Sequence, residues 1–276
     1  MLRRVFGACR ARAGASARAL GRELVLAAWT VIDPRGMVPP RRLVYTGGGD
    51  FLATGSDYLG HLVHLAGLRP DERVLDVGCG IGRIALPLTG YLRPPGSYLG
   101  FDPVGLGIRW CSRRISAAYP GFAFLRCDVR NRRYNPRGRI DPREFRFPAV
   151  DRSRDVVCIV SVFTHMLPGD VERYLDETAR VLAPGGRCLA SFFLVGDLPP
   201  SGGPAVPGAP VFRHPWGTCF VSDPRNPEAA VAYRVRDVEA MFRDRGLVVA
   251  RPVRFGRWTG RGDGADFQDI VVASKP

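Results

Sequence analysis

The sequence contains almost no lysine. Lys275 is the single exception among its 40 basic residues, so the other 39 are arginine. It has no pair of cysteines in C-x-x-C spacing, and no apolar run approaches the roughly 20 residues that a membrane-spanning helix requires. These absences argue against a transmembrane segment and against a zinc site built from paired cysteines.

Seven cysteines are present, an odd number, and several of them lie inside apolar runs that are typical of strands. Free cysteines of this kind behave as small buried hydrophobic residues, and disulfide frameworks belong to oxidising compartments. We therefore predict reduced, buried thiols in a cytoplasmic protein, with no metal site.

The formal net charge is +14, which could attract nucleic acid, anionic lipid or an acidic substrate. The arginines are scattered rather than arranged in one stripe, and a chain so rich in arginine, alanine, glycine and proline indicates a bias in codon usage. We therefore expect no nucleic-acid partner. Six arginines and no acid lie within residues 1–22, which suits an exposed basic helix or a frayed end better than a transit peptide.

The chain divides by its patterning into a helical N-terminal extension, residues 1–55, and a main domain, residues 56–276. Within the main domain, predicted strands alternate with predicted helices. Strands are expected over 74–77, 97–102, 122–127, 155–160, 187–194, 247–255 and 268–273, and helices over 56–67, 83–92, 107–118, 168–182 and 235–245.

This alternation predicts an α/β fold with a doubly wound, mostly parallel sheet of seven strands. The last two strands have no helix between them, so they should form an antiparallel terminal hairpin. Two turn-rich segments interrupt the pattern, near 129–151 and 195–230. Both leave the carboxyl edge of the sheet, where long connections usually form lids or substrate walls.

The strongest local signal follows the first predicted strand. That strand carries Asp76 near its end, and Gly78, Gly80 and Gly82 alternate through the turn that leads to the next helix. Glycines let the backbone approach a ligand closely, and the helix N-terminus offers unpaired N–H groups. The turn also fits the dinucleotide fingerprint G-x-G-x-x-G/A, so by itself it leaves NAD and other adenosine cofactors open.

The ends of the next two strands also carry acids. Asp102 can accept hydrogen bonds from both ribose hydroxyls of an adenosine. Asp128 can accept from the adenine amino group, and the backbone N–H of Val129 can donate to a ring nitrogen.

The order and spacing of these residues resemble class I S-adenosyl-L-methionine (S-adenosylmethionine) methyltransferases. The stretch Arg180–Arg187 (RVLAPGGR) is similar to the L-x-P-G-G turn before the fifth strand of that family, and the resemblance extends over about residues 70–194. It implies a Rossmann-like methyltransferase fold with S-adenosylmethionine as cofactor. The cofactor contacts that it implies come from Asp76, Gly78, Cys79, Gly80, Gly82, Asp102, Asp128, Val129 and Ser161.

The fourth strand is followed by Ser161–Leu167 (SVFTHML), and in many small-molecule members of the family this segment faces the methyl group. His165 is therefore the candidate catalytic residue, because a histidine can deprotonate an acceptor at neutral pH. Two alternatives stay open: the histidine packs on the cofactor or caps a helix, or no general base exists. Further candidates for lining the acceptor pocket are Asp50, Tyr58, Tyr134 and Trp258.

We predict methyl transfer to O, N or C of a small-molecule acceptor, such as a glycan or a secondary metabolite. The motif N/D-P-P-[YF] of many nucleic-acid and amino-group methylating members is absent after the fourth strand. An RNA or protein methyltransferase that uses the arginine-rich segment 126–146 is the alternative. A cofactor-binding protein without catalysis, and an NAD dehydrogenase, are the remaining ones.

Overall fold

The computed structural model describes residues 36–196, 206–260, 264 and 266–276. The basic segment 1–22 lies outside the described residues, as does most of the predicted N-terminal extension. From 36 to 50 the chain is irregular apart from one 3-10 turn, η1 (Arg41–Leu43). The side chain of Asp50 then accepts a hydrogen bond from the backbone N–H of Ala53 at 2.7 Å. This cap starts helix α2 (Phe51–His64) five residues before its predicted position.

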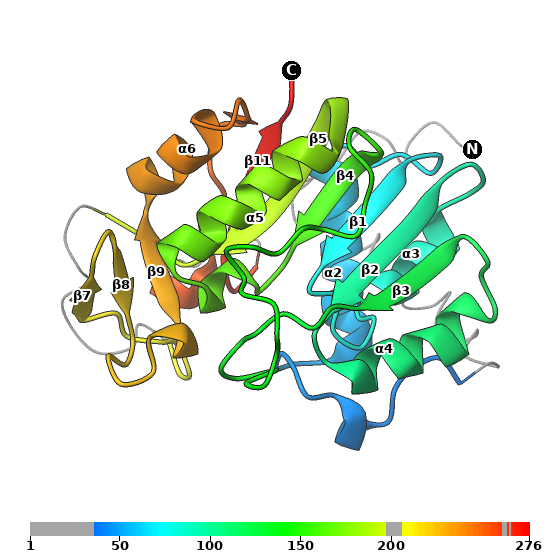
Figure 1. Cartoon of the computed structure of the whole chain (residues 1–276), viewed down its shortest axis with the longest axis horizontal. Helices are drawn as coiled ribbons and strands as arrows, with labels where there is room; N and C mark the ends of the chain where they lie inside the picture. The colour runs from blue at the N-terminus through cyan, green and yellow to red at the C-terminus, as the bar shows by residue number, and fades with distance from the viewer. Residues whose placement is uncertain (1–35, 197–205, 261–263, 265) are drawn as a thin grey trace, which may run out of the picture.

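A seven-stranded sheet forms the centre of the molecule, in the order β10-β11-β5-β4-β1-β2-β3 (Figure 1). Its strands are β1 (Arg73–Val77), β2 (Ser97–Asp102), β3 (Phe122–Arg126), β4 (Arg154–Ile159), β5 (Leu182–Phe192), β10 (Val248–Val249) and β11 (Asp269–Ser274). The five strands from β3 to β5 are parallel, whereas β11 runs antiparallel to both β5 and β10. The predicted doubly wound sheet with its antiparallel terminal hairpin is confirmed.

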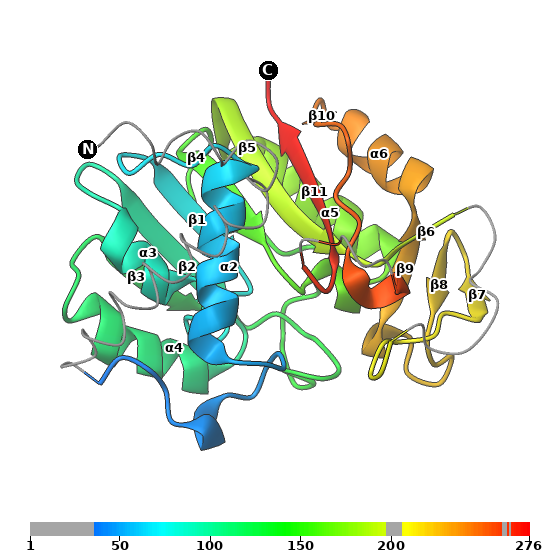
Figure 2. The ribbon, with the colours of Figure 1, turned by 180° about the vertical axis from the view of Figure 1, so that it is seen from behind.

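Helices cover both faces of this sheet. One face carries α5 (Pro168–Val181) and α6 (Val235–Arg243), in front in Figure 1, and α2 crosses the opposite face in Figure 2. That second face also packs against α3 (Ala85–Tyr91) and α4 (Gly105–Cys111). The helix after α4 continues to Ser116 with π-type hydrogen bonding.

Two separate cores follow from the period of the strands. Side chains alternate across a strand, so Val74 packs in the core beneath α2 while Leu75 packs in the core beneath α5. Leu62 and Leu175, both fully buried, anchor their helices to these cores. Burying each such leucine stabilises the fold by about 1.5–3 kcal/mol.

Ion pairs occupy the amino edge of the sheet. The guanidinium of Arg187 donates to both oxygens of the nearly buried Glu72, at 2.9 and 2.7 Å, and Arg73 pairs with Asp155 at 2.8 Å. These contacts tie β5 to the segment before β1, and β1 to β4. These ion pairs lie at the amino edge, so they do not occupy the carboxyl edge, where the sequence places the cofactor site.

A second sheet lies beside the first, next to α6 (Figures 1 and 2). Its order is β6-β9-β8-β7, with strands β6 (Leu194–Val195), β9 (Val231–Arg234), β8 (Cys219–Val221) and β7 (His214–Trp216). The turn-rich segment near 195–230 therefore contains the short strands β7 and β8, and its residues 197–205 lie outside the described part. Aromatic side chains hold this sheet in its own small core, among them Phe193, Phe212, Phe220 and Trp258.

Two further elements differ from their predicted extent. The strand expected over 247–255 is reduced to β10 plus an isolated bridge between Arg254 and Ile270. Pro252 interrupts it, because proline has no N–H for a ladder. The segment 129–151 contains no strand, as predicted, but only isolated bridges and turns. None of the helices in the described segments is long and apolar enough to cross a membrane.

Candidate active site

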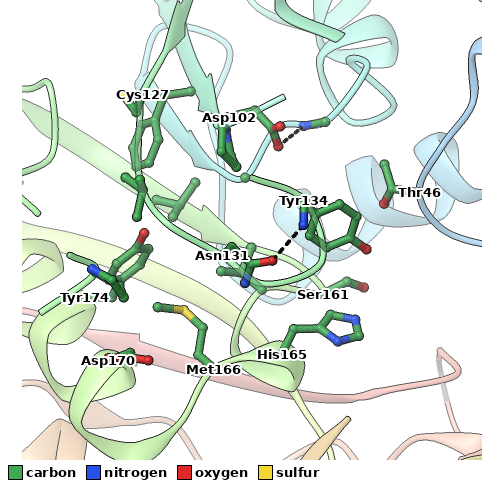
Figure 3. A pocket seen from close by; sticks show the side chains of 18 of the residues that line it. Thr46, Asp102, Cys127, Asn131, Tyr134, Ser161, His165, Met166, Asp170 and Tyr174 are labelled. Atoms are coloured by element: carbon green, nitrogen blue, oxygen red, sulfur yellow. Dashed lines mark hydrogen bonds between the residues drawn. The ribbon is translucent and has the colours of Figure 1, made fainter. Parts of the chain in front are cut away.

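A hollow opens at the carboxyl edge of the main sheet, and we call it the main hollow (Figure 3). Six of the ten predicted site residues line it, namely Gly78, Gly80, Asp102, Val129, Ser161 and His165. The predicted residues that do not line it are Asp76, Cys79, Gly82 and Asp128. Its other walls include Tyr45, Thr46, Tyr134, Asp170, Tyr174 and Glu228.

The glycine turn has the backbone form that its sequence predicts. Gly78, Gly80 and Gly82 have φ values of +76°, +57° and +85°. At Gly78 a Cβ would lie only 2.5 Å from a methyl carbon of Val162, so the turn and the end of β4 approach too closely for any side chain. A Cβ on Gly82 would instead meet the Cys111 sulfur at 2.8 Å, which places this glycine against α4. The side chain of Cys79 likewise lies in the core.

Asp102 ends β2 beside this turn and is 7% exposed. Its carboxylate accepts hydrogen bonds from the N–H groups of Gly80 (3.0 Å) and Val104 (2.8 Å), and from the Tyr45 hydroxyl (3.3 Å). Burial raises the pKa of Asp102, and the three donors act against that rise. A carboxylate held at this point can accept from further hydroxyls of a ligand in the main hollow.

Residues 44–49, which we call the strap, include two residues that line the main hollow. Arg83, the residue directly after the glycine turn, donates to the carbonyl oxygens of Thr46 (2.9 Å), Gly47 (3.3 Å) and Gly48 (3.1 Å). The Tyr45 hydroxyl fixes the strap to Asp102 at its other end. The strap contributes Tyr45 and Thr46 to the wall of the main hollow.

Asp76 lies in β1, directly before the glycine turn, and does not line the main hollow. It is 1% exposed and accepts a 2.6 Å hydrogen bond from the hydroxyl of Tyr98. Burial raises the pKa of Asp76 to about 7, the hydroxyl of Tyr98 opposes this rise, and the charge of Asp102 adds to it. A direct contact between Asp76 and a cofactor stays a prediction.

Asp128 follows β3 at the rim of the main hollow. Its carboxylate accepts from Arg139 at 2.8 Å and from the side-chain amide of Asn135 at 3.1 Å. These contacts lower the pKa of Asp128. Its neighbours Cys127 and Val129 line the main hollow, whereas the contact of Asp128 with an adenine stays a prediction.

His165 lies in the short turn η3 (Phe163–His165) after β4. Its Nδ1 is 3.2 Å from the backbone carbonyl oxygen of Glu228, in the 3-10 turn η4 (Pro227–Ala229) beside the second sheet. A carbonyl oxygen can only accept, so Nδ1 carries the proton and Nε2 keeps a lone pair. Burial lowers the pKa of His165, with a further contribution from the charge of Arg133, so the imidazole is neutral at pH 7.

A second hollow adjoins the first, and the two share part of their lining. Its lining is Val44, Tyr45, Thr46, Gly47, Gly48, Arg133, Tyr134, Ser161, His165 and Gln268. His165, Tyr134 and Ser161 line both hollows, and Figure 3 shows these three side chains near one another. These shared side chains can therefore contact a ligand in either hollow.

Ser161 has a left-handed backbone, with φ of +56°, at the point where β4 ends. Its N–H donates to the Ser191 hydroxyl at 2.7 Å. The hydroxyls of Ser161 and Ser191 both donate to the side-chain oxygen of Gln268, at 3.0 and 2.7 Å. This network links the end of β4 to β5 and to the residue before β11.

Sequence reasoning missed Tyr45, Glu228 and Gln268. Tyr45 lies in an irregular segment and Glu228 in the short 3-10 turn η4, and Gln268 precedes a strand whose pairing alone brings it to the site. Of the further candidates, Tyr134 does line both hollows. Asp50 caps α2, Tyr58 is a buried residue of α2 itself, and Trp258 is buried in the core of the second sheet.

Metal ligands do not gather in the described part of the chain, where no three His, Cys, Asp or Glu side chains could hold an ion together. The six described cysteines are all buried and free.

Comparison with known proteins gives a family match over part of the chain. Residues 74–186 match the model of the methyltransferase domain family. A tRNA N(3)-cytidine methyltransferase, METTL2 of Gallus gallus, is 28% identical over 125 residues. That match covers 42% of this chain and 29% of the relative, so the chain corresponds to under a third of that protein.

Solved structures share the fold at low identity. A Pyrococcus horikoshii OT3 protein has a TM-score of 0.55 at 16% identity, with 90% of this chain and 99% of that chain covered. A SAM-dependent methyltransferase from Aquifex aeolicus has a TM-score of 0.51 at 15% identity, with 91% of this chain and 98% of that chain covered. Magnesium protoporphyrin IX methyltransferase from Synechocystis PCC 6803, with bound SAH, has a TM-score of 0.51 at 15% identity, with 95% of this chain and 99% of that chain covered.

Proposed function

We propose that this protein is a class I S-adenosylmethionine-dependent methyltransferase that methylates a small-molecule acceptor, because its residues 74–186 match the model of the methyltransferase domain. The acceptor atom is an oxygen, nitrogen or carbon. The observation that carries this proposal is the pair of adjoining hollows, which share His165. The main hollow is assigned to the cofactor and the second hollow to the acceptor.

The residues of the main hollow suit S-adenosylmethionine. The glycine turn leaves no room for a Cβ at Gly78, and such a turn admits a ligand against the backbone. The buried carboxylate of Asp102 faces the hollow, where ribose hydroxyls can reach it. Val129 lines the main hollow, where its backbone N–H can donate to a ring nitrogen of an adenine.

The bound cofactor supplies an electrophilic methyl group on a sulfonium. His165 supplies a neutral imidazole whose Nε2 can take a proton from the acceptor hydroxyl or amine, while Nδ1–H stays on the Glu228 carbonyl. The walls of the two hollows align the acceptor atom and exclude water from it, and positioning of this kind contributes a large part of the acceleration.

The pairing of the arginines supports a small acceptor over RNA. Within 126–146, five of the eight arginines form ion pairs with carboxylates: Arg126 and Arg139 with Asp128, Arg130 with Asp141, Arg143 with Asp170, and Arg146 with Asp151. Phosphate-binding surfaces need arginines whose charge is available. The METTL2 relative is the specific observation that favours RNA as the second candidate acceptor.

Calorimetric titration with S-adenosylmethionine, S-adenosylhomocysteine and NADH tests the cofactor assignment. We expect micromolar binding of both adenosyl ligands and none of NADH. Asp102→Asn, which keeps the size of the side chain, should weaken that binding at least 10-fold. Asp71→Ala is the control, because Asp71 is an exposed carboxylate at the amino edge. Binding of NADH alone, or of nothing, would refute the assignment.

Transfer of a radiolabelled methyl group tests the acceptor class. Small hydroxyl, amine and carbon acceptors are compared with bulk tRNA, at 50 and 200 mM salt. Label in a small molecule supports the proposal. Label in tRNA, with binding that falls steeply as salt rises, would establish the RNA candidate instead.

A further inference from the structure

We propose that the second hollow recognises an oxyanion, a carboxylate or a phosphate, carried by the acceptor beside the atom that is methylated. Arg133 and Gln268 are the residues that bind it, and this inference rests on the assignment of the second hollow to the acceptor. Neither residue belongs to the motifs of the cofactor site.

Arg133 brings an uncompensated charge to this hollow. It forms no ion pair with any carboxylate that the structure describes, unlike most arginines of the same segment. Its guanidinium lies over the ring of Tyr134, 5.3 Å from the ring centroid, which fixes its direction. A guanidinium that is held in place and has no acid partner suits a carboxylate or a phosphate, since it can donate two parallel hydrogen bonds.

Gln268 adds neutral donors on the same wall. Its side-chain oxygen already accepts from two hydroxyls, those of Ser161 and Ser191. The remaining polar atom of that amide is its NH2 group, which has two hydrogens and can only donate. Because Gln268 lines the hollow, these hydrogens are available to an oxygen of the ligand.

Both donors line the hollow that His165 also lines. Arg133 is close enough to His165 for its charge to contribute to the lowered pKa of the imidazole. An oxyanion held between Arg133 and Gln268 therefore lies next to His165 and next to the wall shared with the main hollow. The acceptor hydroxyl or amine is then a near neighbour of its own anionic group, as in a hydroxy acid, an amino acid or a sugar phosphate.

Binding of small anions to the protein saturated with S-adenosylhomocysteine tests the proposal. The probes are benzoate and inorganic phosphate, with benzamide as the uncharged match to benzoate, measured by calorimetry or by NMR shift. We expect one of the anions to bind at least 10-fold more tightly than benzamide. Arg133→Gln and Gln268→Glu should each lower the affinity for that anion at least 5-fold. Both variants should keep the affinity for S-adenosylhomocysteine within 2-fold of the value of the unmodified protein.

Arg137→Gln is the matched control, because it removes the same charge from an exposed arginine of the same segment that does not line the hollow. If Arg137→Gln loses as much affinity for the anion as Arg133→Gln, the effect comes from the general electrostatic field of the protein, and the proposal is overturned. It is also overturned if the protein does not prefer an anion to benzamide.

Weaker binding of S-adenosylhomocysteine itself in Arg133→Gln would also overturn it, since the hollow would then hold the cofactor's own carboxylate. Failure of the unmodified protein to bind S-adenosylhomocysteine at all would instead refute the proposed function, so the two failures are distinguishable.

Discussion

Arg83 connects the glycine turn to the strap, and removing its side chain should open the strap without unfolding the protein. In Arg83→Ala, the carbonyl oxygens of Thr46, Gly47 and Gly48 lose their guanidinium partner. Each such contact contributes about 0.5–1.5 kcal/mol net, and the 3.3 Å contact and partial exposure reduce the sum to about 2 kcal/mol. A free-energy difference of 1.4 kcal/mol changes an equilibrium constant by a factor of ten. The population ratio of open strap to closed strap should therefore rise by about 30-fold.

The assay combines calorimetry with hydrogen exchange. The strap supplies Tyr45 and Thr46 to the main hollow, so the Kd for S-adenosylhomocysteine should rise by up to about 30-fold. Backbone amides of residues 44–50 should exchange correspondingly faster, while those of β1 and β4 stay protected.

Arg93→Ala is the matched control for this prediction. Arg93 also donates to carbonyl oxygens, those of Gly90 and Leu92, but at the amino edge of the sheet. It should leave both measurements unchanged. If Arg83→Ala binds S-adenosylhomocysteine as tightly as the unmodified protein and its strap exchanges no faster, the strap is held by other contacts and the reasoning is wrong.

Three further predictions concern single side chains. His165→Gln should lower kcat for methyl transfer by about 100-fold or more. With His165 intact, kcat/KM should fall on the acid side only below pH 6.5, because its pKa is lowered and the neutral form is needed. Asp76 has a folded-state pKa raised to about 7, so stability should decline as pH rises from about 4 to 7, by up to about 4 kcal/mol. Asp76→Asn should lack this decline in urea unfolding at pH 5 and 8; an equal decline would contradict the assignment. Asp269 is fully buried and accepts from Leu194 N–H, Gly256 N–H and the Trp258 indole, so Asp269→Asn should lower the free energy of unfolding by about 2–4 kcal/mol.

The architecture of the main sheet and half of the site could be predicted from the chain alone. Strand and helix periods are local, and the carboxyl ends of parallel strands must meet at one edge. That is why Gly78, Asp102 and His165, which lie at or after the carboxyl ends of parallel strands, were predicted together and line one hollow. The methyltransferase resemblance rested on the same strand ends, and the family match over 74–186 bears it out.

Only the tertiary structure decided the rest, since it depends on contacts between distant residues. Tyr45 and Asp102 are 57 positions apart, His165 and Glu228 are 63, and Ser161 and Gln268 are 107. No periodicity records such pairs: the second sheet brings the Glu228 carbonyl to the imidazole, and the pairing of β11 with β5 brings Gln268 to Ser191. Local patterns determined which residues end the strands, whereas long-range packing determined which groups surround them.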